Sequence, residues 1–259
     1  MEWQIATQTH CGNVRRINED SLLVDKSYPL LMIADGMGGH AAGDVASRML
    51  AEKLGALPLA RGLSDALAQI RSAVMRCNSD MIEYARHNLA GQTIGSTVVA
   101  MLAQGFTGAC VWAGDSRLYR ARGGRLQQLT VDHSHVANMV RAGRLSAEEA
   151  QNHPYSNVIT RAVGAAPELD LDSNTFDIVP GDTYLVCSDG LYNEVSDGEI
   201  LSSMLARDIW WSSHQLLNLC LSRKARDNVS FIIGRPVAVI EDDLDITSTF
   251  YPEVDSTLP

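Results

Sequence analysis

Four short strand-like stretches follow one another in the middle of the chain with only a few residues between them. They occupy residues 96–102, 108–113, 117–122 and 125–130. Each has the length of a strand, and the last two are joined by Gly123-Gly124, a typical hairpin turn. A connection this short joins antiparallel neighbours, because a parallel pair needs a crossover of a dozen or more residues. The chain is therefore predicted to contain an antiparallel sheet, which weighs against a purely βαβ fold.

Helical periodicity appears on both sides of this region. Apolar side chains recur at three- and four-residue spacing in residues 44–54 and again after Ser64, which predicts two helices, with Ser64 as the N-cap of the second. Residues 133–164 have a polar, helical character, and Ser196 begins a Ser-x-x-Glu pattern that is typical of a helix N-terminus. Further strand-like runs occupy residues 28–34, 182–187 and 229–233.

Length and charge indicate one large domain followed by an acidic tail. The chain has 259 residues, which suits a domain over residues 1–236. The net charge is −10, and residues 237–259 contain six acidic residues and no Lys or Arg. Basic clusters are short, so neither nucleic acid nor an anionic membrane is an expected partner. The tail is expected to be disordered or to bind a partner.

The cysteines indicate a reducing compartment. They are five in number, widely spaced and without a Cys-x-x-Cys pair, and four lie in apolar stretches where a reduced thiol packs as a small apolar group. Residues 1–10 lack the pattern of a signal peptide, and no apolar run approaches the ~18 residues of a membrane helix. The sequence therefore predicts a cytoplasmic protein that does not bind membranes.

Acidic residues recur where apolar strand-like runs begin or end. They are Glu19, Asp20, Asp35, Asp115, Asp189 and Asp227. Several carboxylates that converged would repel one another unless a cation neutralised them, and oxygen ligands suit Mg²⁺ or Mn²⁺. No Cys/His pattern for zinc is present, since His133-x-His135 lacks partners at suitable spacing. The alternative is that each Asp simply forms a turn, as Asp-Gly commonly does.

A glycine-rich segment at residues 36–41 matches the dinucleotide-binding pattern G-x-G-x-x-A. Asp35 would then place a negative charge beside the pyrophosphate. The second parallel strand of that motif is also missing, because another helical stretch follows the first. We therefore reject a nucleotide-binding interpretation of this segment.

Seven short motifs, taken in order, resemble the PP2C (PPM) family of metal-dependent protein serine/threonine phosphatases, in particular its compact bacterial members. They are Thr9-x-x-Gly12-x-x-Arg15-x-x-Asn18-Glu19-Asp20, the run from Ala34 to His40, Gly95-Ser96-Thr97, Gly114-Asp115-Ser116-Arg117, Leu129-Thr130-x-Asp132-His133-Ser134, Ser188-Asp189-Gly190-Leu191, and Asp227-Asn228. The resemblance implies an α+β fold, a four-layer αββα sandwich of two antiparallel sheets between helices. It also implies that residues 133–164 form a flap beside the active site, with plain scaffold as the alternative.

The resemblance implies a role for each acidic position. Asp35 would bridge two Mn²⁺ or Mg²⁺ ions, with the Gly36 carbonyl on one of them, and Asp189 and Asp227 would bind the second. Glu19 and Asp20 would hold metal-bound waters, and Asp115, with Asp189, a third and weaker ion. Two bridged cations lower the pKa of a shared water, which can then attack phosphorus.

Two further residues carry implied catalytic roles. Arg15 matches the arginine that grips substrate phosphate. Many family members have a histidine where this chain has Met37, and that histidine is assigned as the general acid. Since Met cannot donate a proton, the acid here would be His40, a metal-bound water, or neither.

The expected function is hydrolysis of phosphoserine and phosphothreonine in proteins by a monomer that opposes a Ser/Thr kinase. Two alternatives stay open: a phosphoprotein-binding protein without hydrolysis, and another phosphoesterase acting on nucleotides or nucleic acid. The complete set of expected aspartates weighs against the first, and the acidic balance against the second.

Overall fold

The computed structural model describes residues 1–38, 42–146, 149–150, 153–155 and 158–237. One sheet has the order β1 (Glu2–His10), β11 (Val229–Val237), β10 (Thr183–Cys187), β7 (Arg117–Arg122) and β8 (Arg125–Gln128). The other has the order β2 (Asp20–Asp25), β3 (Leu30–Gly38), β5 (Val98–Gln104), β6 (Thr107–Ala113) and β9 (Asp172–Asp177), with β4 (Ile94–Ser96) paired to β3. All of these neighbours are antiparallel, as predicted.

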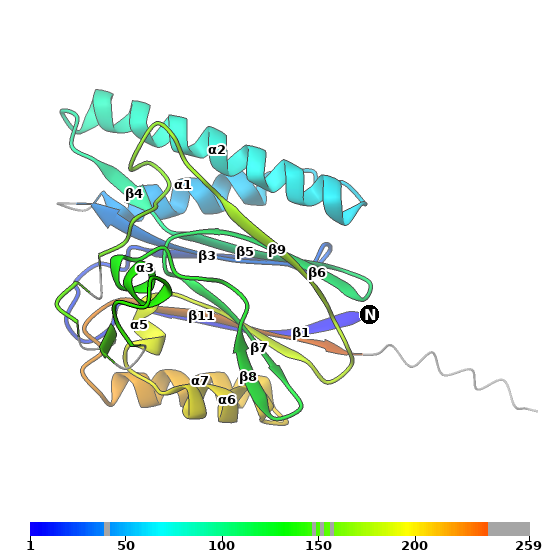
Figure 1. The fold of residues 1–259 in the computed structure, drawn as a ribbon. Coiled ribbons are helices and arrows are strands. Elements are labelled where there is room, and N and C mark those ends of the chain that lie inside the picture. Colours follow the sequence, from blue (N-terminus) through cyan, green and yellow to red (C-terminus); the bar gives the residue numbers. More distant parts are fainter. Residues whose placement is uncertain (39–41, 147–148, 151–152, 156–157, 238–259) are drawn as a thin grey trace, which may run out of the picture.

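Helices cover the outer faces of both sheets (Figure 1). The helices α1 (Gly43–Gly55) and α2 (Leu63–Asn88) pack on the β2–β9 sheet, and α6 (Asp197–Leu205) and α7 (Ile209–Leu221) pack on the other. Two short helices, α3 (His135–Arg141) and α5 (Asp189–Tyr192), lie at one end of the sandwich. The predicted αββα architecture is confirmed.

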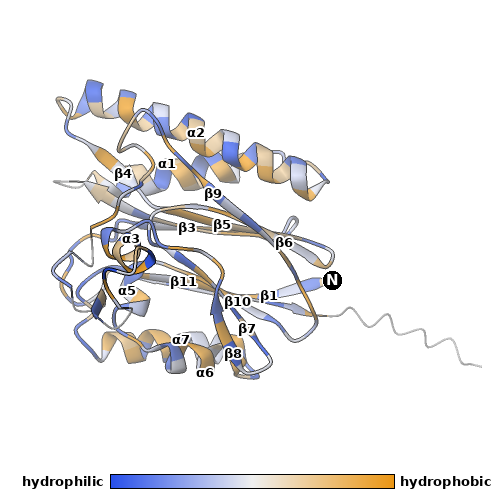
Figure 2. Ribbon diagram, viewed as in Figure 1, coloured by the Kyte–Doolittle hydropathy of each residue, from blue (hydrophilic) through white to orange (hydrophobic). Residues whose placement is uncertain are grey.

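The apolar strands serve two cores at once, which is why they are apolar throughout. In β3, Leu30 and Met32 face α1 and α2, whereas Leu31 and Ile33 belong to the core between the sheets. Successive side chains of a strand point to opposite faces, so a strand covered on both sides needs apolar residues at every position. The apolar inner strands and mixed helices are visible in Figure 2.

Several local predictions were wrong. The strand predicted to stop before Asp35 continues through it to Gly38, because β4 pairs with its last residues. The second helix begins after Gly62, and Ser64 lies inside its first turn instead of capping it. Within residues 133–164, the described helical residues are α3 and Glu149–Ala150, which follow a capping box between Ser146 and Glu149, whereas residues 158–164 form no helix although helical character was expected there.

Sequence analysis missed the short strand β4 and two edge strands, β1 and β9. β1 and β9 carry mostly polar, exposed or half-buried side chains, because each lies at the edge of its sheet. Four cysteines are buried, as their apolar surroundings predict. Within the described ranges, no helix combines the length and apolar character needed to cross a bilayer.

Candidate metal-binding active site

Five aspartates lie near one another at the end of the sandwich where α5 lies, and the charges of the other four all act on Asp35; we call the five the carboxylate cluster. They are Asp20, Asp35, Asp115, Asp189 and Asp227. The register of β2 and β3 places Asp20 directly opposite Asp35. The Ser188 hydroxyl, from the other sheet, donates a hydrogen bond to Asp20 Oδ2 at 2.9 Å. The cluster therefore joins the two sheets.

The backbone of Asp35 is fixed from both sides by β4 and the residue after it. Its N–H donates to Thr97 Oγ1 at 3.0 Å, and its carbonyl accepts from Thr97 N–H at 2.9 Å and from Ser96 Oγ at 3.0 Å. Thr97 Oγ1 also lies 2.7 Å from Ser116 Oγ, in the loop that carries Asp115. These bonds explain the Gly-Ser-Thr motif, since they tie the Asp35 strand to the Asp115 loop.

Asn228 holds the loops around Asp227 and Glu19 together. Its Oδ1 accepts from Glu19 N–H at 2.8 Å, and its Nδ2 donates to the carbonyls of Cys11 and Ile17. Glu19 Oε1 in turn accepts from Gly43 N–H at 3.2 Å, at the start of α1. Asn228 thus positions Glu19 just before β2, and its side chain does so through hydrogen bonds to backbone groups.

Arg15 is the cation beside the cluster. Its Nη2 donates to Asp227 Oδ2 at 2.7 Å, while the two side chains stay 51% and 40% exposed. One contact leaves most of the guanidinium open to solvent. An arginine held in this way can turn part of its fork to an incoming anion.

The carboxylates raise one another's pKa values. Burial raises the pKa of Asp35 well above its ordinary range, and the charges of Asp20, Asp189, Asp115 and Asp227 raise it further. Burial likewise raises the pKa of Asp189, with the charges of Asp115 and Asp227 next in size. Without a counter-charge the cluster is therefore electrostatically strained, as carboxylates brought together in a site commonly are.

The donor set fits hard divalent cations. Asp20 Oδ1 is buried and has no hydrogen-bond partner among the described residues, so a cation or its bound water would satisfy it. Among the described residues, no three His, Cys, Asp or Glu side chains are arranged to hold one ion by themselves. Mg²⁺ and similar ions need none, because they keep several waters and take one or two carboxylates each.

Close backbone approaches bring the Asp189 and Asp227 segments together. A Cβ on Gly190 would lie 1.9 Å from the carbonyl oxygen of Asn228, so only glycine fits there. Gly36 is similar, since its Cβ would lie 2.0 Å from the Gly43 carbonyl oxygen. The glycine of each Asp-Gly pair therefore permits packing, in addition to any role in a turn.

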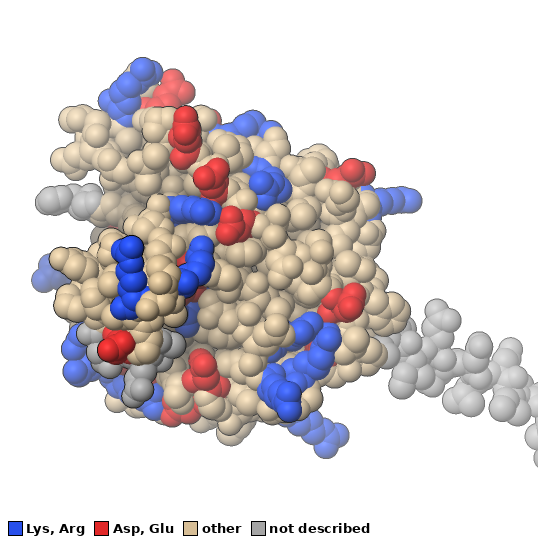
Figure 3. Space-filling view, in the orientation of Figure 1, with Lys and Arg blue, Asp and Glu red and all other residues tan. Residues whose placement is uncertain are grey.

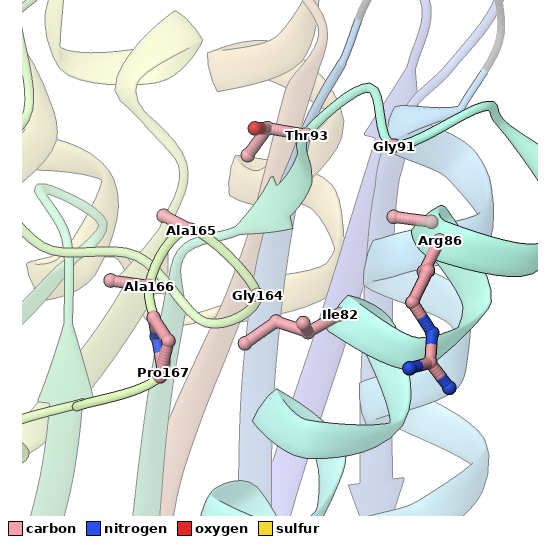
Figure 4. A pocket seen from close by; sticks show the side chains of 9 residues that line it. Ile82, Arg86, Gly91, Thr93, Gly164, Ala165, Ala166 and Pro167 are labelled. Atoms are coloured by element: carbon pink, nitrogen blue, oxygen red, sulfur yellow. The ribbon is translucent and has the colours of Figure 1, made fainter.

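A separate shallow cavity of about 200 Å³ lies between the end of α2 and the loop at residues 164–167 (Figure 4). Its lining includes Ile82, Thr93 and Pro167, with Arg86 as the charged residue and no carboxylate. This chemistry differs from that of the carboxylate cluster, and we assign no role to the cavity.

The sequence matches the family described as Protein phosphatase 2C over residues 7–216. The chain belongs to the protein phosphatase 2C family. A relative in that family, the serine/threonine protein phosphatase PstP of Mycobacterium tuberculosis (strain ATCC 25618 / H37Rv), is 37% identical over 229 residues, which are 88% of this chain and 44% of the relative. The chain thus spans less than half of that relative's length.

Solved structures of the family agree with the fold. PppA of Pseudomonas aeruginosa, described as a key regulatory component of T6SS, has a TM-score of 0.84 and 36% identity, with 91% of this chain and 98% of that chain covered. The catalytic domain of PstP in complex with two manganese ions has a TM-score of 0.83 and 35% identity, with 92% and 99% covered.

The structure brings together nearly all of the residues singled out in the sequence. Glu19, Gly36 and Arg15 border the carboxylate cluster, whereas His40 lies outside the described residues. Sequence reasoning assigned no role to Thr97, Ser188 and Asn228, although all three stood in the quoted motifs. Their positions in the same motifs as the acidic residues were the sequence signal that could have identified them.

Proposed function

We propose that this chain is a protein serine/threonine phosphatase that hydrolyses phosphoserine and phosphothreonine with two bound Mn²⁺ or Mg²⁺ ions. The observation that carries the proposal is the carboxylate cluster itself, in a protein phosphatase 2C fold. Buried carboxylates that repel one another are costly to keep, and a pair of divalent cations removes that cost.

Each acidic residue receives one role in this proposal. Asp35 would bridge the two ions, and the Gly36 carbonyl would complete one of them. Asp189 and Asp227 would bind the second ion. Glu19 and Asp20 would orient metal-bound waters, which suits the unpartnered Oδ1 of Asp20. Asp115, with Asp189, would hold a third ion that binds more weakly.

The ions would supply a water of lowered pKa and neutralise the phosphate oxygens in the transition state. Arg15 would bind the substrate phosphate, and its single exposed contact with Asp227 leaves its other N–H groups free to do so. Met37 cannot donate a proton to the leaving oxygen. His40 is therefore the candidate acid supplied by the chain itself.

We also propose the context in which the chain acts. Residues 1–236 would form the phosphatase domain, with residues 133–164 as its flap, and the acidic segment 237–259 would follow it. The substrates would be cytoplasmic phosphoproteins made by an opposing Ser/Thr kinase. In the face shown in Figure 3, basic and acidic side chains are interspersed, which does not favour a polyanionic substrate such as nucleic acid.

The test is metal-dependent phosphate release from a phosphothreonine peptide. Purified protein should release phosphate with added Mn²⁺ and stop in EDTA, and activity that persists in EDTA would contradict the proposal. Asp35→Asn and Asp189→Asn should each nearly abolish turnover. The matched control is Asp170→Asn, which removes the same charge from an exposed position outside the cluster. A chain that binds the peptide without releasing phosphate would instead be a binding protein.

A further inference from the structure

Two motifs contain charged residues that the proposed chemistry does not use. Arg117 follows Asp115 by two positions, and Asp132 precedes His133. The side chain of Arg117 is only 22% exposed and that of Asp132 only 15%. Arg117 Nε and Nη2 donate to both carboxylate oxygens of Asp132 at 2.7 to 3.1 Å. Two mostly buried charges of opposite sign, in bidentate contact, are expected to hold a fixed geometry.

Arg117, unlike Arg15, directs its guanidinium to several partners within the protein. Its Nη1 donates to the Tyr119 hydroxyl at 2.7 Å, and its guanidinium carbon lies 3.5 Å from the centroid of the Tyr192 ring. The cation is therefore held at its edges by Asp132 and Tyr119 and covered on one face by Tyr192. Such stacking needs the planar guanidinium, which a lysine cannot reproduce.

Tyr192 connects this stack to the carboxylate cluster. It is the last residue of α5, the helical turn that begins with Asp189. Its hydroxyl donates to the main-chain carbonyl of Asp115 at 3.0 Å. One side chain thus spans the two segments that supply Asp115 and Asp189, and Arg117 fixes the plane of its ring.

We propose that Arg117 and Tyr192 are positioning residues that set the spacing between the Asp115 and Asp189 carboxylates, and hence the affinity of the weaker cation site between them. This inference rests on the proposed function, because it presumes that these two carboxylates share a divalent ion. Neither residue touches the ion or the substrate. Groups that orient metal ligands in this way affect metal affinity by about 10- to 100-fold.

The decisive variant is Tyr192→Phe, which keeps the ring over Arg117 and removes only the bond to the Asp115 carbonyl. Calorimetric titration of metal-free protein with Mn²⁺ should show the weakest binding step loosened by about tenfold or more, with the tighter steps unchanged. The Mn²⁺ concentration for half-maximal rate should rise in parallel, and excess Mn²⁺ should restore kcat. The control is Tyr184→Phe, which removes another buried tyrosine hydroxyl bond, to Asp182, outside the cluster.

Arg117→Lys provides a second, independent variant. It should weaken the same binding step, and the double variant Arg117→Lys/Tyr192→Phe should lose no more than the worse single one, because both act through one chain of contacts. If Tyr192→Phe lowers the melting temperature but leaves every Mn²⁺ step unchanged, the two residues are merely structural and the inference fails. A wild-type chain with only two Mn²⁺ steps would overturn this inference and the assignment of a third ion to Asp115, while the proposed two-metal phosphatase activity would stand. A chain that binds no Mn²⁺ would overturn that proposed function as well.

Discussion

Replacing a cluster carboxylate should make the metal-free protein more stable while it removes activity. Asp189→Asn is the most direct case. The substitution preserves the shape of the side chain and an acceptor oxygen for Asn193, whose Nδ2 donates to Asp189 Oδ2 at 3.2 Å. It removes the carboxylate whose negative charge Asp115 and Asp227 repel. The substitution therefore tests two effects separately: the loss of activity and the gain in stability of the metal-free protein.

The magnitude follows from the pKa. Burial and neighbouring charges raise the pKa of Asp189 from 3.8 to about 8. At pH 7 the Asp189 carboxyl is ionised in the unfolded chain but largely protonated in the folded, metal-free chain. Since one pKa unit corresponds to about 1.36 kcal/mol, this difference favours unfolding by at most about 4 kcal/mol. Removing one charge relieves only its share of a mutual repulsion. If the substitution recovers a quarter of that difference of about 4 kcal/mol, the free energy of unfolding rises by about 1 kcal/mol, which would raise the melting temperature by about 2–4 °C.

The assay is thermal unfolding in EDTA at several pH values. The folded chain binds more protons than the unfolded chain between pH 4 and 8, so wild-type stability should fall as the pH rises through that window. Asp189→Asn should melt higher than wild type at pH 7, and the difference should vanish near pH 4. Asp170→Asn, at an exposed position, should show no such gain. If metal-free Asp189→Asn melts at or below wild type at pH 7, the carboxylates do not repel one another as argued.

Three further outcomes are expected. Binding of Mn²⁺ at pH 7 should release protons, because the raised pKa values must fall; calorimetric heats that are the same in buffers of different ionisation enthalpy would contradict this. Arg15→Ala should lower kcat/KM for a phosphopeptide by about 10- to 100-fold, with little change in melting temperature because its ion pair is exposed; an unchanged kcat/KM would remove Arg15 from the phosphate site. Gly190→Ala should destabilise the fold by about 1–3 kcal/mol in urea unfolding because it overlaps the Asn228 carbonyl, whereas Gly198→Ala, with open space around its Cβ, should not.

The sequence predicted the architecture well where hydrophobic periodicity and turn chemistry agreed. The hairpin of β7 and β8 is one example, because both of its turn glycines have positive φ angles, 55° at Gly123 and 74° at Gly124. The edge strands β1 and β9 were missed because their polar side chains carry no strong period. The end of β3 was misplaced because pairing with β4, distant in sequence, outweighed the local turn signal of Asp35-Gly36.

For the site, the sequence supplied the identity of the acidic residues but not their convergence. That convergence depends on register between strands, such as Asp20 opposite Asp35, and on bonds between sheets, such as Ser188 to Asp20. Neither can be read from spacing along one chain. The contacts of Arg117 were equally hidden, since Asp132 and Tyr192 are 15 and 75 positions away.

The pairing of β1 with β11 places Glu2 and Val237 far from the carboxylate cluster. Glu2 pairs with Val237 at one end of these strands, and His10 pairs with Val229 at the other, beside the Asp227 loop. Eight residue-to-residue steps of extended strand separate those pairs, a distance of about 26 Å. A label, tether or fused domain joined next to Glu2 or Val237 would therefore begin at the far end of the sandwich (Figure 1), and immobilising the protein through either position should leave the carboxylate cluster open to a phosphoprotein.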